Sequence, residues 1–542
     1  FEPDVEGGYR RINGFRKYVN QIVPQTNNAT EKVLMSVRFA NRVVAARGER
    51  IFSAGSTELS QKIISTTSMS GSGTINVDST AGFGSTGTLV INSEEFTYTG
   101  ISSTAFTGVT RSTSSTTAAN HAIDDAVSEN WTQRDTDRTS ADKYNFEKFN
   151  FDGTEKLICV DGVNAPVIFN SSMAATDVSE STVAGSKFVA AFRNHMFYAG
   201  KSSTSSTLVF SEPFDEDGFV VNDGAGSINV DDTIVGLKVF RDNLFIFCEN
   251  RIFKLTGSAL ANFAVEPVTR NIGCVNGNTI QEFAGDLIFL GPDGLRTVAG
   301  TARIGDVELG TISKNVQSLF DENIRDSSLF ESVVIPDKTQ YRIFFTKDTV
   351  SAKRTKGVIC VMKGDGFEFA ESLGIKPSCS DTHVEAGDVV VLHGGFDGFV
   401  QRQERGNTFD GSAILGRYRS PDLNFGDVGI RKSMHRVILN YKPEANISAD
   451  LFLRYDNEAV GASRPAAYSL TTATLGAQYG TSTYSTASST TQFVYGGGSQ
   501  PLVRQPVEGS GFTVALKIDD NGASPPYSLK GFQLEYQVGA RR

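Results

Sequence analysis

A pattern of apolar and polar positions repeats along most of this chain: an apolar run, a short turn and an alternating run. Residues 242–255 and 285–298 show it clearly, with turns of Glu-Asn and Pro-Asp-Gly. Their first arms are rich in residues that favour strands, and a tight turn between two such arms is typical of a β-hairpin. We therefore expect each of these segments to form a β-hairpin.

The same pattern recurs often enough to predict a repeat architecture. The hairpin segments are 41–52, 155–169, 194–199 with 207–210, 242–255, 285–298, 341–345 with 357–361, and 388–393 with 398–401. Their spacing of roughly 40 to 55 residues, once one insertion is set aside, lies in the range of propeller blades. A hairpin buries only one face, so repeated hairpins must stack, most economically in a closed ring. We predict an all-β fold with a β-propeller of about seven blades; a β-sandwich with similar hairpins is the alternative.

Two stretches depart from the repeat. Residues 71–128 contain short alternating strands separated by Gly and Ser turns, which predicts an inserted small β-domain at a loop tip. From about residue 413 the strands become longer, which predicts a β-sandwich-like C-terminal domain. The Ser/Thr/Tyr-rich segment 462–498 has too few apolar residues for a core and is expected to be a long loop.

The predicted domain division follows from these changes in pattern. Residues 1–70 would form an N-terminal arm and the first propeller hairpin, 71–128 the inserted domain, 129–412 the rest of the propeller, and 413–542 the C-terminal domain. Within the propeller, apolar residues at helical spacing predict one amphipathic helix over residues 310–324. The segment 353–356, with three basic residues, is expected to be a solvated loop between strands.

Composition narrows the class of function. The 542 residues carry 51 Lys and Arg against 61 Asp and Glu, a net charge of −10, and no basic stripe of the kind that grips nucleic acid. An acidic surface can, however, line a passage through which DNA slides. The five cysteines have no CxxC spacing, and Cys159, Cys248 and Cys360 lie inside predicted strands, where a cysteine behaves as a small hydrophobe, so we expect folding in a reducing compartment without structural disulfides. No run of about 18 apolar residues exists, so we expect no membrane-spanning segment.

A search for chemistry finds no catalytic, cofactor-binding or metal-binding residues that we would assign. Gly200-Lys201-Ser202 lacks the earlier glycine of a phosphate loop, and Gly71-Ser72-Gly73 lacks a third glycine. The incomplete or unsupported candidates are the possible metal ligands Cys379, His383 and His393, the calcium-loop fragments 215–218 and 519–522, which are better interpreted as turns, and the isolated histidines His121, His195 and His435. We predict that the chain is not an enzyme.

The N-terminal segment 6–18 is basic and interleaved with aromatic residues. It would be either an arm that docks on a partner or on phosphates, or a solvated lead-in strand, and we favour the second. Its sequence Gly-Gly-Tyr-Arg-Arg-Ile-Asn-Gly-Phe over residues 7–15, followed by the 41–52 hairpin, resembles the start of the tail nozzle, or tail tubular, proteins of short-tailed bacteriophages. Residues 303–320 and the closing 531–542 are similar to that family too.

This resemblance implies a structural subunit of a virion tail, assembled in the host cytoplasm. Its implied partners are further copies in a homohexamer, an adaptor and portal ring above, tail fibres or a tail tip protein, and double-stranded DNA passing through without sequence-specific binding. The inserted domain would contact a neighbouring tail component. Two other readings stay open: a glycan-binding or glycan-hydrolysing propeller, and a receptor-binding tail fibre protein.

Overall fold

The computed structural model gives the fold of most of the chain. It describes residues 1–542 apart from 20, 25–31, 56–72, 81–82, 93, 124, 126, 137, 140, 142, 299–310, 350–351, 365, 386, 444–446, 459–464, 473–501, 524–525 and 540–542. Contacts divide the chain into two compact units. Unit 1 comprises Phe1–Arg16, Ile359–Gly374 and Gln403–Arg542, and unit 2 comprises Lys17–Val358 and Ile375–Arg402.

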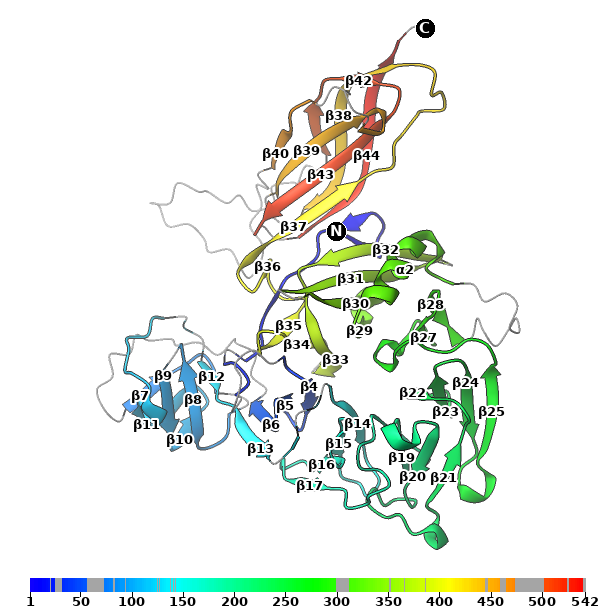
Figure 1. The fold of residues 1–542 in the computed structure, drawn as a ribbon. Helices are drawn as coiled ribbons and strands as arrows, with labels where there is room; N and C mark the ends of the chain where they lie inside the picture. Colours follow the sequence, from blue (N-terminus) through cyan, green and yellow to red (C-terminus); the bar gives the residue numbers. More distant parts are fainter. Residues whose placement is uncertain are drawn as a thin grey trace. The chain divides into compact units, whose positions relative to one another are not determined.

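Unit 2 is built from successive antiparallel sheets, each formed by strands that are consecutive or nearly consecutive in the sequence (Figure 1). The sheets are β4 (Met35–Phe39), β5 (Arg42–Arg47), β6 (Arg50–Gly55) and β13 (Thr132–Asp135); β14 (Asn145–Phe149), β15 (Lys156–Val160), β16 (Val167–Phe169) and β17 (Ala175–Asp177); β18 (Phe188–Phe192), β19 (His195–Ala199), β20 (Thr207–Phe210) and β21 (Gly226–Asn229); β22 (Ile234–Phe240), β23 (Asn243–Cys248), β24 (Ile252–Thr256) and β25 (Ala264–Thr269); β26 (Gln281–Phe283), β27 (Asp286–Gly291) and β28 (Gly294–Thr297); β29 (Leu329–Ile335), β30 (Gln340–Thr349) and β31 (Ala352–Lys363); and β33 (Pro377–Glu385), β34 (Asp388–Gly395) and β35 (Val400–Gln403).

Every predicted hairpin is present as a pair of neighbouring strands in one of these sheets. The 242–255 hairpin, for example, is β23 paired with β24, and the 285–298 hairpin is β27 paired with β28. One detail was wrong: residues 353–356 are not a loop but part of β31, because β30 and β31 extend well beyond the apolar arms that the sequence shows. The Thr346 and Thr355 hydroxyls, 2.9 Å apart, hydrogen-bond across this extension.

Neighbouring sheets bury their faces against one another. The sheet of β14–β17 contributes Ile158 and Val160 to a core that it shares with Met196 and Tyr198 of the next sheet. Apolar side chains of β19 and β23 form the following core in the same way. This arrangement is that of a β-propeller, in which each hairpin hides its apolar face between its neighbours. The number of seven blades stays a prediction.

The first and last sheets of the propeller are joined by the N-terminal segment of unit 2. Their shared core includes Phe52 of β6 and Leu392 of β34. Across the same boundary, the Tyr18 amide donates to the Val400 carbonyl at 2.8 Å and the Val23 amide donates to the Gly398 carbonyl at 2.9 Å. Hydrogen bonds from the start of the unit therefore extend its last sheet and close the ring.

The insertion between β6 and β13 has a sheet and a core of its own, as predicted. Its strands are β7 (Gly73–Asn76), β8 (Gly87–Ile91), β9 (Glu94–Tyr98), β10 (Gly100–Ser102), β11 (Ala105–Arg111) and β12 (Val127–Glu129). Phe96, Phe106 and Val127 lie in its core. The insert is thus a separate packing unit within the chain's path.

The predicted amphipathic helix is shorter than the pattern indicated. A 3-10 turn, η7 (Lys314–Val316), precedes helix α2 (Gln317–Asp326), whereas the prediction covered residues 310–324, of which residue 310 lies outside the described residues. Phe320 is fully buried and meets Phe345 of β30 edge to face, with ring centroids 5.7 Å apart. The other 3-10 turns are η1 (Thr113–Ser115), η2 (Ser202–Thr204), η3 (Val221–Asp223), η4 (Leu260–Asn262), η5 (Gly277–Thr279), η8 (Pro336–Lys338) and η9 (Asp456–Glu458).

Unit 1 is a β-sandwich. One layer contains β1 (Glu2–Pro3), β2 (Tyr9–Arg10), β44 (Tyr527–Val538), β38 (Lys432–Pro443), β41 (Leu502–Pro506) and β42 (Ser510–Gly511), and the other contains β36 (Thr408–Phe409), β37 (Ser412–Arg419), β43 (Val514–Gly522), β39 (Ile447–Tyr455) and β40 (Tyr468–Thr472). Leu439, Leu451 and Leu516, from three of these strands, meet in the core between the layers. Strands β3 (Phe15–Lys17) and β32 (Gly366–Leu373) complete the strand list.

The residues that make up unit 1 do not follow the predicted domain boundaries, which lie at residues 70, 128 and 412. Residues 1–16 group with the C-terminal strands, because Tyr9 and Arg10 of β2 pair with Leu529 and Ser528 of β44. Part of the expected loop 462–498 is a strand, β40, and its residues from 473 onward lie outside the described residues. Local composition gave no sign of pairings between residues more than 500 positions apart.

Candidate functional site

Two of the sequence motifs that imitate binding sites make structural hydrogen bonds, and residues 71 and 72 of a third motif lie outside the described residues. In Gly200-Lys201-Ser202, the Lys201 ammonium donates to the Ser181 carbonyl at 2.7 Å, so it fastens one loop to another. In the 215–218 fragment, the Asp217 amide donates to the Asp215 carboxylate at 3.0 Å, as in a turn. Neither segment presents a set of converging ligands.

The second calcium-loop fragment, 519–522, was wrongly interpreted as a turn, since it ends strand β43. Asp519 accepts a hydrogen bond from Arg417 at 3.0 Å and pairs with Lys517 at 2.6 Å. Asp520 is fully buried beside Arg11, 3.3 Å away. These carboxylates are held by basic side chains.

Cys379, His383 and His393 do not gather into a metal site. Cys379 and His383 lie on alternate positions of β33, whereas His393 of β34 stands opposite Ser380, whose side chain projects from the other face of the sheet. Burial raises the pKa of the Cys379 thiol to about 11 and lowers the pKa of His393 to about 3. Among the described residues, no group of three or more His, Cys, Asp or Glu is placed to hold a metal ion.

The three isolated histidines have separate surroundings. His195 is buried, with Nδ1 2.6 Å from the Ser211 carbonyl, and its ring contacts Phe210. His435 is exposed on β38. His121 belongs to a polar network in the inserted domain.

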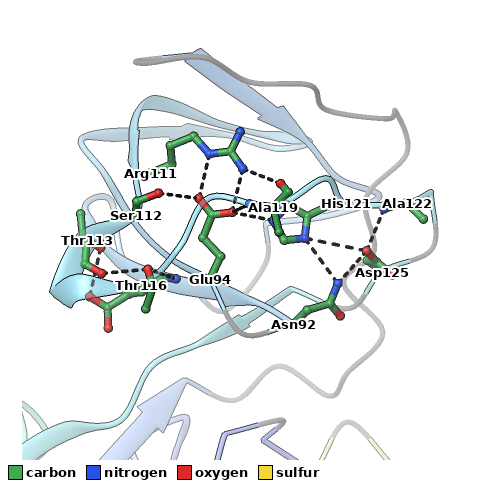
Figure 2. A network of polar contacts seen from close by, with 11 residues as sticks. Asn92, Glu94, Arg111, Ser112, Thr113, Thr116, Ala119, His121, Ala122 and Asp125 are labelled. Carbon is green, nitrogen blue, oxygen red and sulfur yellow. Dashed lines mark hydrogen bonds and ion pairs between the residues drawn. The ribbon is translucent and has the colours of Figure 1, made fainter.

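That network surrounds the fully buried carboxylate of Glu94 (Figure 2). The Arg111 guanidinium donates two hydrogen bonds of 2.7 Å to it, the Ala119 amide donates one of 2.8 Å, and His121 Nε2 lies 3.0 Å away. Burial alone would raise the pKa of Glu94, but these hydrogen bonds outweigh it and lower the pKa to about 2. All groups in the network are satisfied by one another, so it fastens the loop after β11 to the β8–β9 hairpin.

The strongest candidate site is the axis of the propeller. Here a cavity of about 550 Å³ is lined by residues of β14, β18, β22, β26, β29 and β33, which are the first strands of successive sheets, together with Met35 of β4. Its charged lining residues are Lys143, Glu147, Lys148, Lys238, Glu282, Glu331 and Asp381. We call this space the inner cavity. Both signs of charge face it.

An ion pair lines the inner cavity. Lys143 pairs with the buried carboxylate of Glu331. Burial raises the pKa of Glu331, and the Lys143 charge opposes that rise. Lys143 also lines a second cavity of about 580 Å³, which shares Asn145, Phe188 and Asn278 with the first. The two cavities thus adjoin at Lys143, and we call the second one the mouth cavity.

Glu147, in the inner cavity, has an unusual protonation equilibrium. Burial raises the pKa of this carboxyl to about 7, although the Lys238 ammonium and the Ala191 amide both favour the charged form. The folded chain therefore holds a proton on Glu147 up to neutral pH. The unfolded chain releases it near the ordinary glutamate pKa of 4.5.

This difference predicts a pH effect on stability. Folding raises the pKa of Glu147, so the free energy of unfolding decreases as pH rises from about 4.5 toward 7. Above about pH 7 the carboxyl is charged in both states, and the folded chain bears the full cost of burying that charge. We expect Glu147→Gln to melt at a higher temperature than the unmodified chain at pH 8, and to lose this advantage at pH 5. Melting curves across pH 5–8 measure it; parallel pH profiles of the two proteins would contradict the prediction.

The mouth cavity is framed by loops from successive sheets. Its walls come from the β15–β16 turn, the β19–β20 loop, the β23–β24 turn and the segment 275–278 before β26. Hydrogen bonds fix these walls: the Asp161 carboxylate accepts from the Asn164 amide at 2.7 Å, and the Asn276 side chain accepts from the Asn278 amide at 2.9 Å. The cavity is therefore preformed.

Sequence reasoning missed the residues of both cavities because it followed the apolar arms of the hairpins. The axial strands precede those arms and carry charged residues between apolar ones, as in Phe146-Glu147-Lys148-Phe149 of β14. This alternation before each hairpin was the available signal. The charged residues that line the cavities come from several sheets, so the pattern within any one repeat does not show which of them lie close together.

Comparisons with known proteins give structural likeness only. No protein-family model matches the chain, and no curated protein matches it by sequence. Similar solved structures include the N-terminal domain of Nup159, with a TM-score of 0.30 and 13% identity over 43% of this chain and 67% of that one. PorZ of the type-IX secretion system of Porphyromonas gingivalis has a TM-score of 0.32 and 10% identity, over 76% of this chain and 44% of that one.

An exo-β-1,3-galactanase from Phanerochaete chrysosporium is similar as well, with a TM-score of 0.22 and 10% identity over 88% of this chain and 100% of that one. At these scores none of the likenesses bears on function. The fold is an all-β one, with a propeller and a sandwich. In the part of the chain that the structure describes, no helix has the length and apolar character needed to cross a bilayer.

Proposed function

We propose that this chain is a structural subunit of a bacteriophage tail: a nozzle subunit that forms the distal part of the DNA-ejection conduit. It would act as a homohexamer in the virion, below an adaptor and portal ring and in contact with tail fibres or a tail tip protein. It would not be an enzyme. Double-stranded DNA would pass along the bore without sequence-specific binding.

The observation that carries this proposal is the role of the segments that resemble the nozzle family. Gly8 has φ +81°, and a Cβ there would lie 2.0 Å from the Leu529 carbonyl oxygen, so the glycine allows β2 to approach β44. The opening and closing segments of the chain thus belong to one sheet of the sandwich. A resemblance that rests on sheet packing, rather than on a constellation of reactive groups, favours a structural role.

The axis of the propeller also bears on where DNA would pass. Its cavities, about 550 and 580 Å³, are lined by side chains and adjoin at Lys143, which pairs with Glu331. The major groove of B-DNA alone is about 12 Å wide, so a duplex needs a wider passage than one propeller provides. Under this proposal the bore lies between several copies of the chain, and its net charge of −10 per copy disfavours tight binding of DNA.

The test is the symmetry of the assembled protein. We expect native mass spectrometry and electron micrographs of the purified chain, at increasing concentration, to reveal closed rings of six copies around an open bore. A protein that stays monomeric at the highest concentration reached, or that forms trimers, would contradict the nozzle assignment. Trimers would favour a receptor-binding fibre.

A further inference from the structure

We propose that the mouth cavity of the propeller binds an uncharged oligosaccharide. This site is independent of the assembly proposed above, because all of its lining residues belong to unit 2 of a single chain. Its volume of about 580 Å³ lies within the range of about 300 to 1,000 Å³ that is usual for small-molecule sites.

The first argument is the set of polar groups that the fold leaves available. The hydroxyls of Ser202, Ser205 and Thr233 line the cavity, and among the described residues no hydrogen bond occupies them. The backbone around them is fixed, since the Ile234 amide donates to the Ser205 carbonyl at 2.9 Å and the Glu249 amide donates to the Thr233 carbonyl at 3.0 Å. A hydroxyl both donates and accepts, so three of them on rigid walls match a ligand that is rich in hydroxyl groups.

The second argument is an aromatic ring that lines the same cavity. Phe188 lines the cavity at the start of β18. Gly200 makes room for it: a Cβ at that position, where φ is +77°, would lie 2.6 Å from the ring. An apolar ring face combined with a few placed polar groups is the usual composition of a small-ligand pocket, and it suits a sugar, which has both apolar C–H and hydroxyl surfaces.

The third argument is the balance of charge, which disfavours an ionic ligand. Lys143 is paired with Glu331, and Asp161 lies 3.6 Å from the Arg138 guanidinium. The remaining charged lining residues, Lys187 and Glu249, have opposite signs. A phosphate or a uronic acid would meet no surplus of positive charge, so we infer a neutral saccharide.

The experiment is calorimetric titration with neutral trisaccharides of glucose, galactose and mannose, beside a uronic acid trisaccharide and inorganic phosphate. We expect at least one neutral trisaccharide to bind. Thr233→Val keeps the side-chain shape and removes the hydroxyl, and should weaken binding about tenfold, the effect of one lost hydrogen bond of about 1.4 kcal/mol. Ser202→Trp should abolish binding by filling the cavity.

The matched control is Ser203→Trp, since Ser203 is exposed on the same turn but does not line the cavity. It should bind as the unmodified chain does. The proposal is overturned if no neutral trisaccharide binds, if only the uronic acid or phosphate binds, or if Ser202→Trp binds normally. Thr233→Val decides the question by itself should Ser202→Trp fail to fold.

Discussion

Glu94→Gln will destabilise the inserted domain by about 3 kcal/mol at neutral pH, because it leaves the Arg111 guanidinium without its buried counter-charge. Both oxygens of the carboxylate are in use in the native network, and glutamine can supply only one acceptor. Hydrogen exchange measures the loss. We expect faster exchange of amides in β8, β9 and β11, with β22–β24 of the propeller unaffected.

Glu95→Gln is the control for this substitution. Glu95 is the adjacent carboxylate on β9 and accepts hydrogen bonds from Asn130 at 2.7 Å and Thr113 at 3.0 Å, but it has no buried arginine to leave unpaired. We expect its effect to stay below about 1 kcal/mol. Equal exchange rates in the two variants would show that the Arg111–Glu94 ion pair contributes little to the stability of the inserted domain.

The hydrogen-bond network around Glu94 should also make the inserted domain less stable in acid. Since the pKa of Glu94 is lowered to about 2 on folding, its stabilising contribution is complete above the ordinary glutamate pKa of 4.5 and is lost as pH falls toward 2. Below about pH 4 the amides of the unmodified insert should therefore show lower protection factors, that is, less protection relative to the exchange rate of an unfolded chain at the same pH. Glu94→Gln should show a weaker acid dependence.

Arg11→Met will destabilise unit 1, also by about 3 kcal/mol, because it leaves Asp520 buried without its cationic partner. The Arg11 guanidinium also donates to the Ile414 carbonyl at 3.0 Å. Burial raises the pKa of Asp520, and the charge of Arg11 opposes that rise. Without Arg11 the buried carboxylate is harder to ionise, so the stability that the variant loses should increase as pH rises. Urea unfolding of unit 1 at pH 5 and pH 8 measures both effects.

Asp520→Asn on the Arg11→Met background is the matching control, and it should restore part of the lost stability by removing the buried charge. A phosphate-docking arm would behave differently: Arg11→Met would weaken DNA binding and leave urea unfolding unchanged. That result would overturn the structural role of Arg11.

Hairpins were predictable from the sequence because their signals are local. An apolar arm, a turn of Glu-Asn or Pro-Asp-Gly, and an alternating arm all lie within about fourteen residues, as in 242–255. The strands of the sandwich and the separate sheet of the insert were predictable for the same reason. The ends of elements were not: residues 353–356 look like a solvated loop, yet the extended β30–β31 pair includes them.

The candidate site was not predictable because it depends on contacts between distant residues. Lys143 and Glu331 are separated by 188 positions, and neither lies in a recognisable motif. The basic N-terminal segment 6–18, which we predicted to be a solvated strand, also depends on contacts with distant residues. Arg11 looks solvated in the sequence, and only the pairing of β2 with β44 shows that it is buried. Charge and polarity alone do not distinguish an exposed side chain from one with a buried partner.

The pairing of β2 with β44 also sets an order of events during synthesis. Tyr9 is synthesised well before its partner Leu529, which lies 520 positions later in the chain. The propeller strands emerge between the two, and domains generally fold as they appear, so the N-terminal strands must wait while the ring assembles. A chain truncated before residue 527 would therefore be released with its first strands unpaired, exposing a sheet edge open to aggregation.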